Sequence, residues 1–516
     1  MSGTIYSIIP PLLAILMVIL TRRVLLSLGV GILSAALLIT NFSIVKTGVT
    51  IFEAVKAIFI SDGELNTWNV YILFFLLILG VVTALISISG GSRAFGEWAE
   101  KRVKTRAGAQ FTAALLGMLI FIDDYFNALA VGQVSRPITD RQKVSRAKLA
   151  YIIDSTSAPV CVISPISSWG AYIIAMLATI FATHGVTEFT PLGAFMTMIP
   201  MNYYVFAALV LVFAVAYFNI NLGSMKVHEE RAIQTGQVVD PAKESLGDVK
   251  EDLPTSDKGT IGNLVWPILA LIVGTVASML ITGYTTIEDK TGATIFTIFE
   301  NTDVSASLLY GGLFGLAVTI LLFFIRGIKA SYFPIAVKEG IKSMLPAIYI
   351  LMFAWVIVDL IGQLETGEYL ASLVEKSNMN VAYLPVILFL LGGFMAFATG
   401  TSWGTFGIML PIAAEITAAT DINMLLPAMA AVLAGSVLGD HCSPISDTTI
   451  LSSTGAGSHH IDHVMTQLPY ALIGGGFATI GYLVLGVTGN GIAGLAVVIL
   501  LLIGFIFFFS KRTKTA

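Results

Sequence analysis

Residues 438–457 read LGDHCSPISDTTILSSTGAG, a polar stretch between two strongly apolar runs at 425–437 and 468–487. It holds two aspartates, one histidine, four serines, three threonines and three glycines. An unpaired backbone N–H or C=O facing lipid costs several kcal/mol, so a polar, interrupted segment must be buried in protein or line a wet cavity. We therefore expect residues 438–457 to break a membrane helix and to line a site.

The composition of the whole chain places this segment in a membrane protein. Of 516 residues, 56% are hydrophobic and 12% are charged, and the mean hydropathy is +0.87. Ordinary soluble domains carry about 25% charged residues. Apolar runs of the roughly 20 residues needed to span a bilayer recur along the chain. We expect an all-α polytopic protein that crosses the plasma membrane many times and has the lipid bilayer as its first partner.

Other function classes find little support. The net charge of -4 indicates no nucleic-acid partner, and two cysteines do not make a disulfide framework. No G-K-[ST] motif is present, so ATP-driven pumping has no basis. A membrane hydrolase that uses His441 or the histidines of SHHIDH (458–463) is a further hypothesis, but no nucleophile triad accompanies them. We expect no enzyme activity and no cofactor.

Short repeated words divide the chain into two related halves. SPIS occurs at 164–167 and 443–446, and YIL occurs at 71–73 and 349–351. The two offsets, 279 and 278 residues, are almost equal. Two matches at one offset indicate an internal repeat. We expect a first membrane repeat at 1–223, a cytoplasmic loop at 224–260, a second repeat at 261–488, and an extra C-terminal helix with a basic tail at 489–516.

Hydropathy predicts the same order of elements in both halves. Residues 107–135 and 382–415 are too long for one span and are interrupted by FIDDYFN and ATGTSWGTFG, so we expect re-entrant hairpins there. Five crossings per repeat and one extra helix are expected at 5–20, 24–40, 69–88, 147–183 (broken), 203–220, 261–281, 307–325, 344–361, 424–458 (broken), 468–487 and 492–509. An odd number of crossings inverts the second repeat relative to the first.

Charge supports this count. With the N-terminus outside, all but four of the 28 lysines and arginines fall in cytoplasmic segments, and the C-terminus is cytoplasmic. This distribution obeys the positive-inside rule. Inverted repeats with broken helices are typical of secondary transporters, whose ion and substrate sites lie at the breaks.

The acidic residues expected at membrane depth have no lysine or arginine beside them. A carboxylate in such surroundings takes up a proton or holds a cation. Hydroxyls and freed carbonyls nearby are hard ligands suited to Na⁺. We expect Na⁺ at Asp124, Asp154, Asp440 and Asp447, within an ion or substrate site of Asp123, Asp124, Asn127, Asp154, Ser155, Ser157, Ser164, Ser167, Thr401, Ser402, Asp440, His441, Ser443, Ser446, Asp447 and Thr448.

Simpler roles compete with these assignments. Asp123 and Asp124 could cap the second leg of a hairpin, and Asp154 could cap the helix that follows it. His441 could handle protons or serve as a hydrogen-bonded spacer. Asp359 and Glu415 are expected to be solvated near the outer surface. The SHHIDH cluster is expected to be solvated or pH-sensing at the cytoplasmic edge, with zinc as a weaker alternative.

Four motifs resemble segments of the NhaC family of sodium/proton antiporters. They are GDHCSPISDTT with LSSTGAG after it (439–457), FIDDYFNALAVG (121–132), DSTSAPVCVISPISSWG (154–170) and TGTSWGTFGIMLPI (399–412). The resemblance implies two hairpins, two broken helices, a scaffold region and homodimers.

The resemblance leaves the substrate open. Similar proteins include simple Na⁺/H⁺ exchangers and exchangers of small organic anions or amino acids. An organic carboxylate would usually need a buried arginine or lysine. The leading hypothesis is therefore exchange of Na⁺ for H⁺. The alternative is Na⁺- or H⁺-coupled transport of a malate- or lactate-like anion or an amino acid.

Overall fold

The computed structural model describes residues 2–21, 23–61, 63–121, 123–165, 167–243, 255–287, 290–366, 369, 372 and 381–513. Most of this is helix, as expected. Within these residues the strands are β1 (Ile60–Ser61) and β2 (Glu64–Leu65), which pair antiparallel. The protein is a multi-pass all-α membrane protein.

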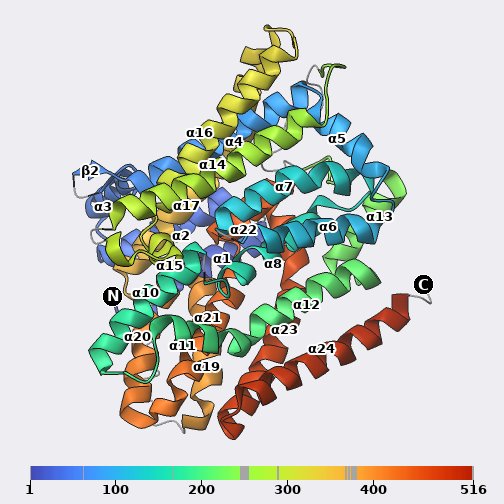
Figure 1. The fold of residues 1–516 in the computed structure, drawn as a ribbon. Helices are drawn as coiled ribbons and strands as arrows, with labels where there is room; N and C mark the ends of the chain where they lie inside the picture. Colours follow the sequence, from blue (N-terminus) through green and yellow to red (C-terminus); the bar gives the residue numbers. More distant parts are fainter. Residues whose placement is uncertain are drawn as a thin grey trace.

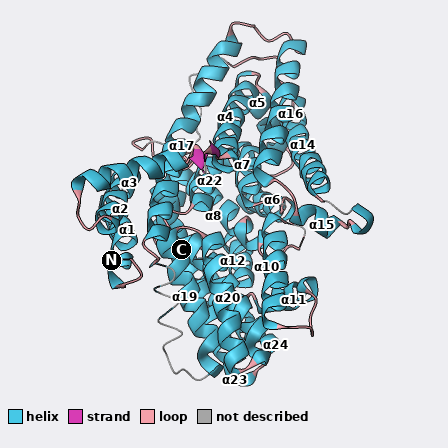
Figure 2. Cartoon of the chain, turned by 90° about the vertical axis from the view of Figure 1, so that its left-hand side faces the viewer, coloured by secondary structure: helices cyan, strands magenta, loops and turns pink. Residues whose placement is uncertain are grey.

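One group of long helices forms the upper part of Figures 1 and 2. Helix α4 packs against α16 and α17, and α16 also packs on α14. Gly311 of α16 lies so close to Thr275 of α14 that a Cβ would collide with it. The members of this group are α4 (Thr67–Ile88), α14 (Gly262–Thr286), α16 (Val304–Ile325) and α17 (Tyr332–Gln363). Beside α17 lie α1 (Ile9–Thr21), preceded by the turn η1 (Ile5–Ile8), and α2 (Val24–Ile39) and α3 (Ile44–Ala57).

A second group forms the lower part of Figures 1 and 2. Helix α19 packs along α21, and α23 contacts α12, α19 and α24. The helices and turns of this group are α10 (Ser168–His184), α11 (Pro191–Met198), η2 (Ile199–Met201), α12 (Tyr203–Phe218), η4 (Val381–Tyr383), α19 (Leu384–Thr399), α20 (Ser402–Thr420), η5 (Ile422–Met424), α21 (Leu425–Cys442), α23 (His460–Thr488) and α24 (Gly491–Thr513).

Short helices from both halves of the chain lie between the two groups (Figure 2). Helix α22 (Asp447–Ala456) packs on α7 (Asp124–Arg141) and α8 (Arg146–Thr156), and α6 (Arg106–Leu119) packs on both α7 and α8. Gly132 of α7 faces Gly455 of α22, and a Cβ on Gly132 would collide with the Gly455 carbonyl. Small residues thus let the two short helices approach closely.

The expected interruptions are present. The first expected hairpin breaks between α6 and α7, and the second between α19 and α20, where Gly400 takes a left-handed φ of 73°. The first expected broken crossing divides into α8, α9 (Ala158–Cys161) and α10, and the second divides into α21 and α22. These breaks place polar side chains at helix ends inside the protein.

By length and composition, eight described helices can cross a membrane, or nine if the bent pair of α11–η2 and α12 counts as one span. The eight are α4, α14, α16, α17, α19 with η4, α21 with η5, α23 and α24. Helices α1, α2 and α10 are apolar but shorter.

Several helices were not expected. The segment at 224–260 begins with α13 (Ser224–Thr235), although we expected a loop, and residues 244–254 lie outside the described ranges. The others are α3, α5 (Gly91–Glu100), α11, and α15 (Ile295–Glu300) with the turn η3 (Lys290–Gly292). Apart from α11, which forms the bent pair with α12, they connect longer helices and lack the 20-residue apolar run by which a crossing is found.

Candidate ion-binding site

Asp123 and Asp124 begin α7 at the first hairpin break, and both are buried. Asp123 is the N-cap: its Oδ1 accepts from the Phe126 N–H at 3.0 Å, and its Oδ2 accepts from the Ser168 hydroxyl at 2.9 Å. The capping role, weighed for both aspartates, is therefore confirmed for Asp123. Asp124 lies in the first turn of α7 and is not the cap.

Only one of the two carboxylate oxygens of Asp124 has a hydrogen-bond partner among the described residues. Its Oδ1 accepts from the Trp169 indole N–H at 2.9 Å, whereas its buried Oδ2 has no hydrogen-bond partner in the described chain. The carboxylates of Asp123, Asp440 and Asp447 lie within electrostatic range of it. Asp124 is thus a buried acid among other acids, with one oxygen unused.

Asp440 lies near the C-terminus of a helix, whereas Asp124 lies at the N-terminus of one. It belongs to the last turn of α21, where unpaired carbonyls give the helix terminus a partial negative charge. Its Oδ2 accepts from the Ser402 hydroxyl at 2.9 Å, and its buried Oδ1 has no hydrogen-bond partner among the described residues. An anion is disfavoured in this position, so a proton or a cation stabilises it.

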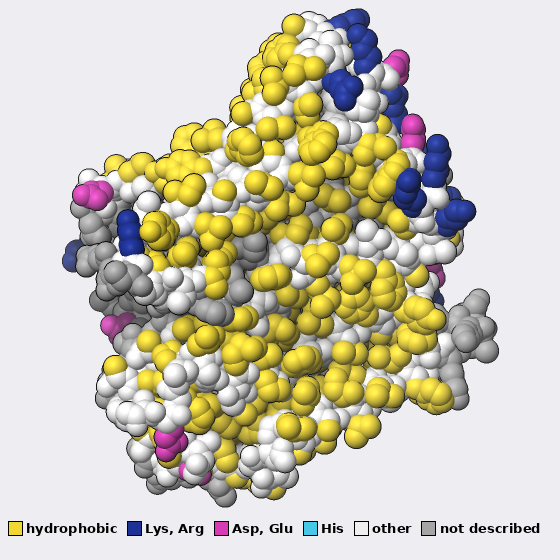
Figure 3. All heavy atoms as spheres, viewed as in Figure 1, with side chains coloured by type: hydrophobic (Ala, Val, Ile, Leu, Met, Phe, Trp, Pro, Cys, Tyr) yellow, Lys and Arg dark blue, Asp and Glu magenta, His cyan; other side chains and the backbone are white. Residues whose placement is uncertain are grey.

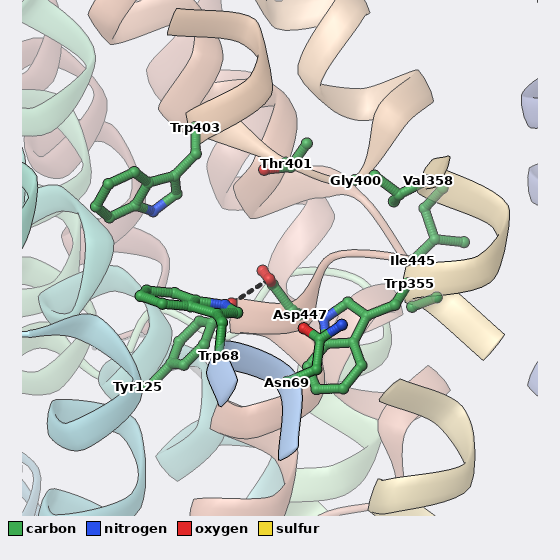
Figure 4. Close-up of a pocket in the computed structure, with 11 residues that line it drawn as sticks. Trp68, Asn69, Tyr125, Trp355, Val358, Gly400, Thr401, Trp403, Ile445 and Asp447 are labelled. Carbon is green, nitrogen blue, oxygen red and sulfur yellow. Dashed lines mark hydrogen bonds between the residues drawn. The ribbon is translucent and has the colours of Figure 1, made fainter. Parts of the chain in front are cut away.

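Asp447 begins α22 and faces a pocket. Its Oδ2 accepts from the Tyr125 hydroxyl, and its Oδ1 accepts from the Thr448 N–H at 2.9 Å. Figure 4 shows the carboxylate pointing toward the space between Trp403 and Trp355. The cavity volume is about 280 Å³. Asp447 is therefore the member of the group that a solute can reach.

A Ser-Trp-Gly sequence supplies the hydroxyl for each of two aspartates. In α10, Ser168 precedes Trp169 and binds Asp123; in α20, Ser402 precedes Trp403 and binds Asp440. The two indoles meet edge to face, with centroids 5.7 Å apart. Each aspartate thus takes its hydroxyl partner from another broken segment, and this joins hairpin and broken helix in both halves of the chain.

Asp154 is surrounded by hydrogen-bonding groups. Its Oδ2 accepts from Gln467 Nε2 at 2.6 Å and from the Thr449 hydroxyl at 3.4 Å, and it lies 3.1 Å from His463 Nε2. Its Oδ1 accepts from the Ser452 hydroxyl at 3.3 Å. Asp154 lies in the last turn of α8 and does not cap the next helix, whose N-cap is Ser157.

His441 is held from both sides of its ring. Its Nδ1 lies 2.6 Å from the Tyr204 hydroxyl, and its Nε2 lies 3.1 Å from the Ser155 hydroxyl and 4.0 Å from Asp154 Oδ2. The ring is buried. This geometry fits the hydrogen-bonded spacer that we weighed against a proton-handling role.

The other predicted site residues mostly bind backbone. Asn127 Nδ2 donates to the carbonyls of Gly117 and Ile120 and so holds the first hairpin break together. Ser157 donates to the Asp124 carbonyl at 2.9 Å. The remaining polar members cap or tie the broken ends, or in one case bind each other: Ser164 to Val160 O, Ser167 to Cys161 O, Thr401 as N-cap of α20, Ser443 to Phe397 O, and Ser446 to Thr448.

The four aspartates expected to hold Na⁺ do not converge on one point. Within the described residues, no three His, Cys, Asp or Glu side chains are placed to hold a metal ion together. The same finding gives the zinc alternative for SHHIDH no support in the part of the chain that the structure describes. Asp154 lies with His463 and Gln467 instead. A Na⁺ at this site would therefore be held by at most two such side chains, together with hydroxyls and carbonyls.

One expectation about polar residues was wrong. His460 and His463 are buried, because α23 begins at His460 and carries them into the protein. Arg136, which we placed in a cytoplasmic segment, is buried in the protein, and its guanidinium donates to the carbonyls of Thr454 and Gly455 at the end of α22. Through these two bonds it binds the negative end of that helix. Asp359 is exposed, as expected.

A buried ion pair anchors the start of α8. Glu229 of α13 accepts from Lys148 Nζ at 3.1 Å and from Arg106 Nη2 at 2.6 Å. Burial alone would raise the pKa of Glu229, but the charges of Lys148 and Arg106 and the Ser145 N–H outweigh it and hold the pKa below its ordinary value. The ionised pair therefore fixes α13 to the helix that carries Asp154.

Sequence reasoning missed Tyr125, Trp169, Gln467 and His463. The first two sit beside predicted residues in DDYF and SSWG, where an aromatic donor next to an aspartate or serine was a usable signal. Gln467 and His463 reach Asp154 across more than 300 positions, and no local pattern indicates that contact.

Known proteins resemble most of the chain. The family model described as "Na+/H+ antiporter family" matches residues 160–487. The chain belongs to this family. The resemblance drawn from the motifs is thereby confirmed, and the protein is a secondary transporter; membership of an antiporter family gives the hydrolase hypothesis no support.

Individual relatives add detail. A protein of Haemophilus influenzae described as uncharacterized is 48% identical over 99% of this chain and 96% of its own length. An uncharacterized Na⁺/H⁺ antiporter of the same organism is 33% identical over 26% of this chain and 29% of its own. The malate-2H⁺/Na⁺-lactate antiporter of Bacillus subtilis is 29% identical over 34% and 36%.

Two solved transporters are distant. The YdaH transporter of Alcanivorax borkumensis has a TM-score of 0.34 at 14% identity, with 86% of this chain and 89% of that chain covered. The Neisseria gonorrhoeae efflux pump MtrF has a TM-score of 0.31 at 13% identity, with 90% and 84% covered.

Proposed function

We propose that this antiporter-family protein exchanges Na⁺ for H⁺, and that the two ions compete for the carboxylates of Asp124, Asp440 and Asp447. The observation that carries the proposal is Asp440. It is buried at a helix C-terminus, has one unused oxygen, and forms no ion pair with a described lysine or arginine. A carboxylate in this position needs a proton or a cation to balance its charge.

Competition follows from the chemistry of one group. A carboxyl that binds a proton loses the charge that attracts Na⁺, so the same oxygen serves one ion at a time. The Ser402 hydroxyl and the freed carbonyls at the end of α21 supply hard oxygen ligands beside Asp440. Asp124, with its own unused oxygen, offers a second carboxylate within electrostatic range.

Asp154 takes a different role in this proposal. Its oxygens already accept from three donors and lie beside His463, so binding Na⁺ would break contacts that are in place. We assign it, with Gln467 and His441, to positioning α8, α22 and α23 around the site. Asp123 caps α7 and fixes the start of the helix on which Asp124 lies.

The proposed architecture consists of two inverted repeats, residues 1–223 and 261–488. The broken segments in matching places of both halves support it. Figure 3 shows lysines and arginines gathered along one edge, around α5 and the turn between α16 and α17. This edge supports a cytoplasmic C-terminus and an outside N-terminus. We propose a homodimer on the family resemblance.

Reconstitution tests the exchange directly. Proteoliposomes are loaded with a preset pH gradient in potassium salts without organic solute, and Na⁺ is added outside. We expect Na⁺-dependent collapse of the gradient in wild type and none in Asp440→Asn. A gradient that collapses only when malate, lactate or an amino acid is supplied would reject simple Na⁺/H⁺ exchange.

The second candidate is coupled transport of a small organic anion or amino acid. The local similarity to a malate-2H⁺/Na⁺-lactate antiporter favours it. The described residues that line the pocket beside Asp447 include one acid and no base, which disfavours an anion there. Uptake of radiolabelled malate or lactate driven by Na⁺ or H⁺ decides between the two.

A further inference from the structure

The pocket beside Asp447 is lined by aromatic rings from different helices. Trp68 comes from the start of α4, Trp355 from α17 and Trp403 from α20. Figure 4 shows the three indoles on different sides of the space toward which the carboxylate points, with Tyr125 behind Trp68. The cavity volume of about 280 Å³ is enough for a small organic molecule.

The charge of this lining has one sign. Asp447 is the acidic member, and no lysine, arginine or histidine is among the described lining residues. Indole faces carry negative electrostatic potential and attract cations, most strongly for tryptophan. The Tyr125 hydroxyl is already committed to Asp447 as a donor. An anion placed here would meet a carboxylate and aromatic faces, whereas a cation would be attracted by both.

The size and apolar character argue for more than a bare metal ion. Na⁺ takes hard oxygen ligands at short range, and indole rings supply none. An ammonium group with carbon substituents can place its charge beside Asp447 and its apolar groups against the rings. Asn69, at the first turn of α4, adds an amide that can bind an N–H or a hydroxyl of such a solute.

We infer that this pocket binds a small organic ammonium cation, at a site that shares Asp447 with the ion exchange and so rests on the proposed function. The bound cation neutralises Asp447 in place of Na⁺ or a proton. It therefore competes with both ions.

Binding to the purified, full-length protein in detergent tests the inference. Tetramethylammonium and methylammonium are titrated by calorimetry at constant ionic strength, and L-malate and L-lactate serve as anionic comparators. We expect saturable binding of the ammonium ions, weakened by added Na⁺. Trp68→Leu should lower tetramethylammonium affinity about fivefold, the size expected for one lost cation–π face.

Trp266→Leu is the matched control. Trp266 is a tryptophan of α14 that is 59% exposed and does not line the pocket. This variant should bind tetramethylammonium like wild type. Thermal unfolding of both variants in the same detergent checks that they are folded.

Three results would overturn the inference. They are no saturable ammonium binding, unchanged affinity in a folded Trp68→Leu, or saturable L-malate binding that Trp68→Leu weakens. Na⁺/H⁺ exchange by wild type in proteoliposomes is measured from the same preparation. Exchange without ammonium binding rejects the inference alone, whereas ammonium binding without exchange rejects the proposed function alone.

Discussion

Asp154 and Asp440 are near neighbours, and the Thr449 hydroxyl lies 3.4 Å from both the Asp154 carboxylate and the Asp440 carbonyl. Their surroundings differ. Asp154 accepts from Gln467, Thr449 and Ser452 and lies beside His463, whereas Asp440 accepts from Ser402 and keeps one buried oxygen without a partner. A saturated carboxylate holds helices together, and an unsaturated one retains the capacity to bind an ion.

The largest effect is expected for Asp440→Asn. The amide cannot carry a charge, so it removes the group for which Na⁺ and H⁺ compete. Na⁺-dependent collapse of a pH gradient in proteoliposomes should fall below detection, while thermal unfolding stays close to wild type. Asp359→Asn, an exposed acid of α17, is the control and should exchange normally. Exchange at wild-type rate in Asp440→Asn would erase the distinction between the two aspartates.

Glu229→Gln tests how α8, the helix that carries the fully hydrogen-bonded Asp154, is anchored. Removing one partner of a buried ion pair leaves Lys148 without its counter-charge, and we expect a loss of about 3–5 kcal/mol in unfolding free energy. The pKa of Glu229 lies below its ordinary value, so the ionised pair stabilises the protein above about pH 4.3 and this contribution is lost as the pH falls through the folded-state pKa. Unfolding curves across pH 3–7 measure both effects. A variant as acid-sensitive as wild type would show that another group is responsible.

Asp154→Asn should affect stability more than transport. The substitution turns an acceptor that serves several donors into an amide that must itself donate, and we expect a loss of about 1–3 kcal/mol. Exchange per folded molecule should stay within about threefold of wild type because the Asp440 carboxylate is untouched. If exchange disappears while unfolding is unchanged, Asp154 belongs with the ion-competing acids.

A pair of serines gives the finest test. Ser402→Ala removes the hydroxyl that binds Asp440, and losses of this kind lower metal affinity about tenfold or more. Ser452→Ala removes one of several donors to Asp154. We expect the Na⁺ concentration for half-maximal exchange to rise about tenfold in Ser402→Ala and to change little in Ser452→Ala. Equal shifts in the two variants would contradict the assignment of Na⁺ to the Asp440 side.

Much of the fold could be predicted because lipid restricts the choices. Long apolar runs indicated α4, α14, α16 and α24. Polar segments such as FIDDYFN and GDHCSPISDTT indicated where helices break. The bounds of α23 could not be predicted in this way, because its first turn is polar and its hydropathy becomes apolar only at Leu468. The expected solvation of His460 and His463 was wrong for that reason.

Partnerships across the chain were harder to predict. The density of aspartates and hydroxyls identified the region of the site, since such residues are rare at membrane depth. Which oxygen remains unused depends on Gln467 and Ser402, which reach their aspartates from other helices. The burial of Arg136 could not be predicted either, because a count of basic residues cannot show which of them is buried in the protein.

Arg136 holds the far end of α22 from α7, Gly132 and Gly455 bring the two helices into direct backbone contact, and Tyr125 binds Asp447 at the near end. These three contacts along the ten residues of α22 hold α7 and α22 together as one rigid unit, which contains one helix from each half of the sequence. In the proposed exchange, movement of this pair as one unit carries Asp124 and Asp447 together, so both acids change their access to the two faces of the bilayer in the same step.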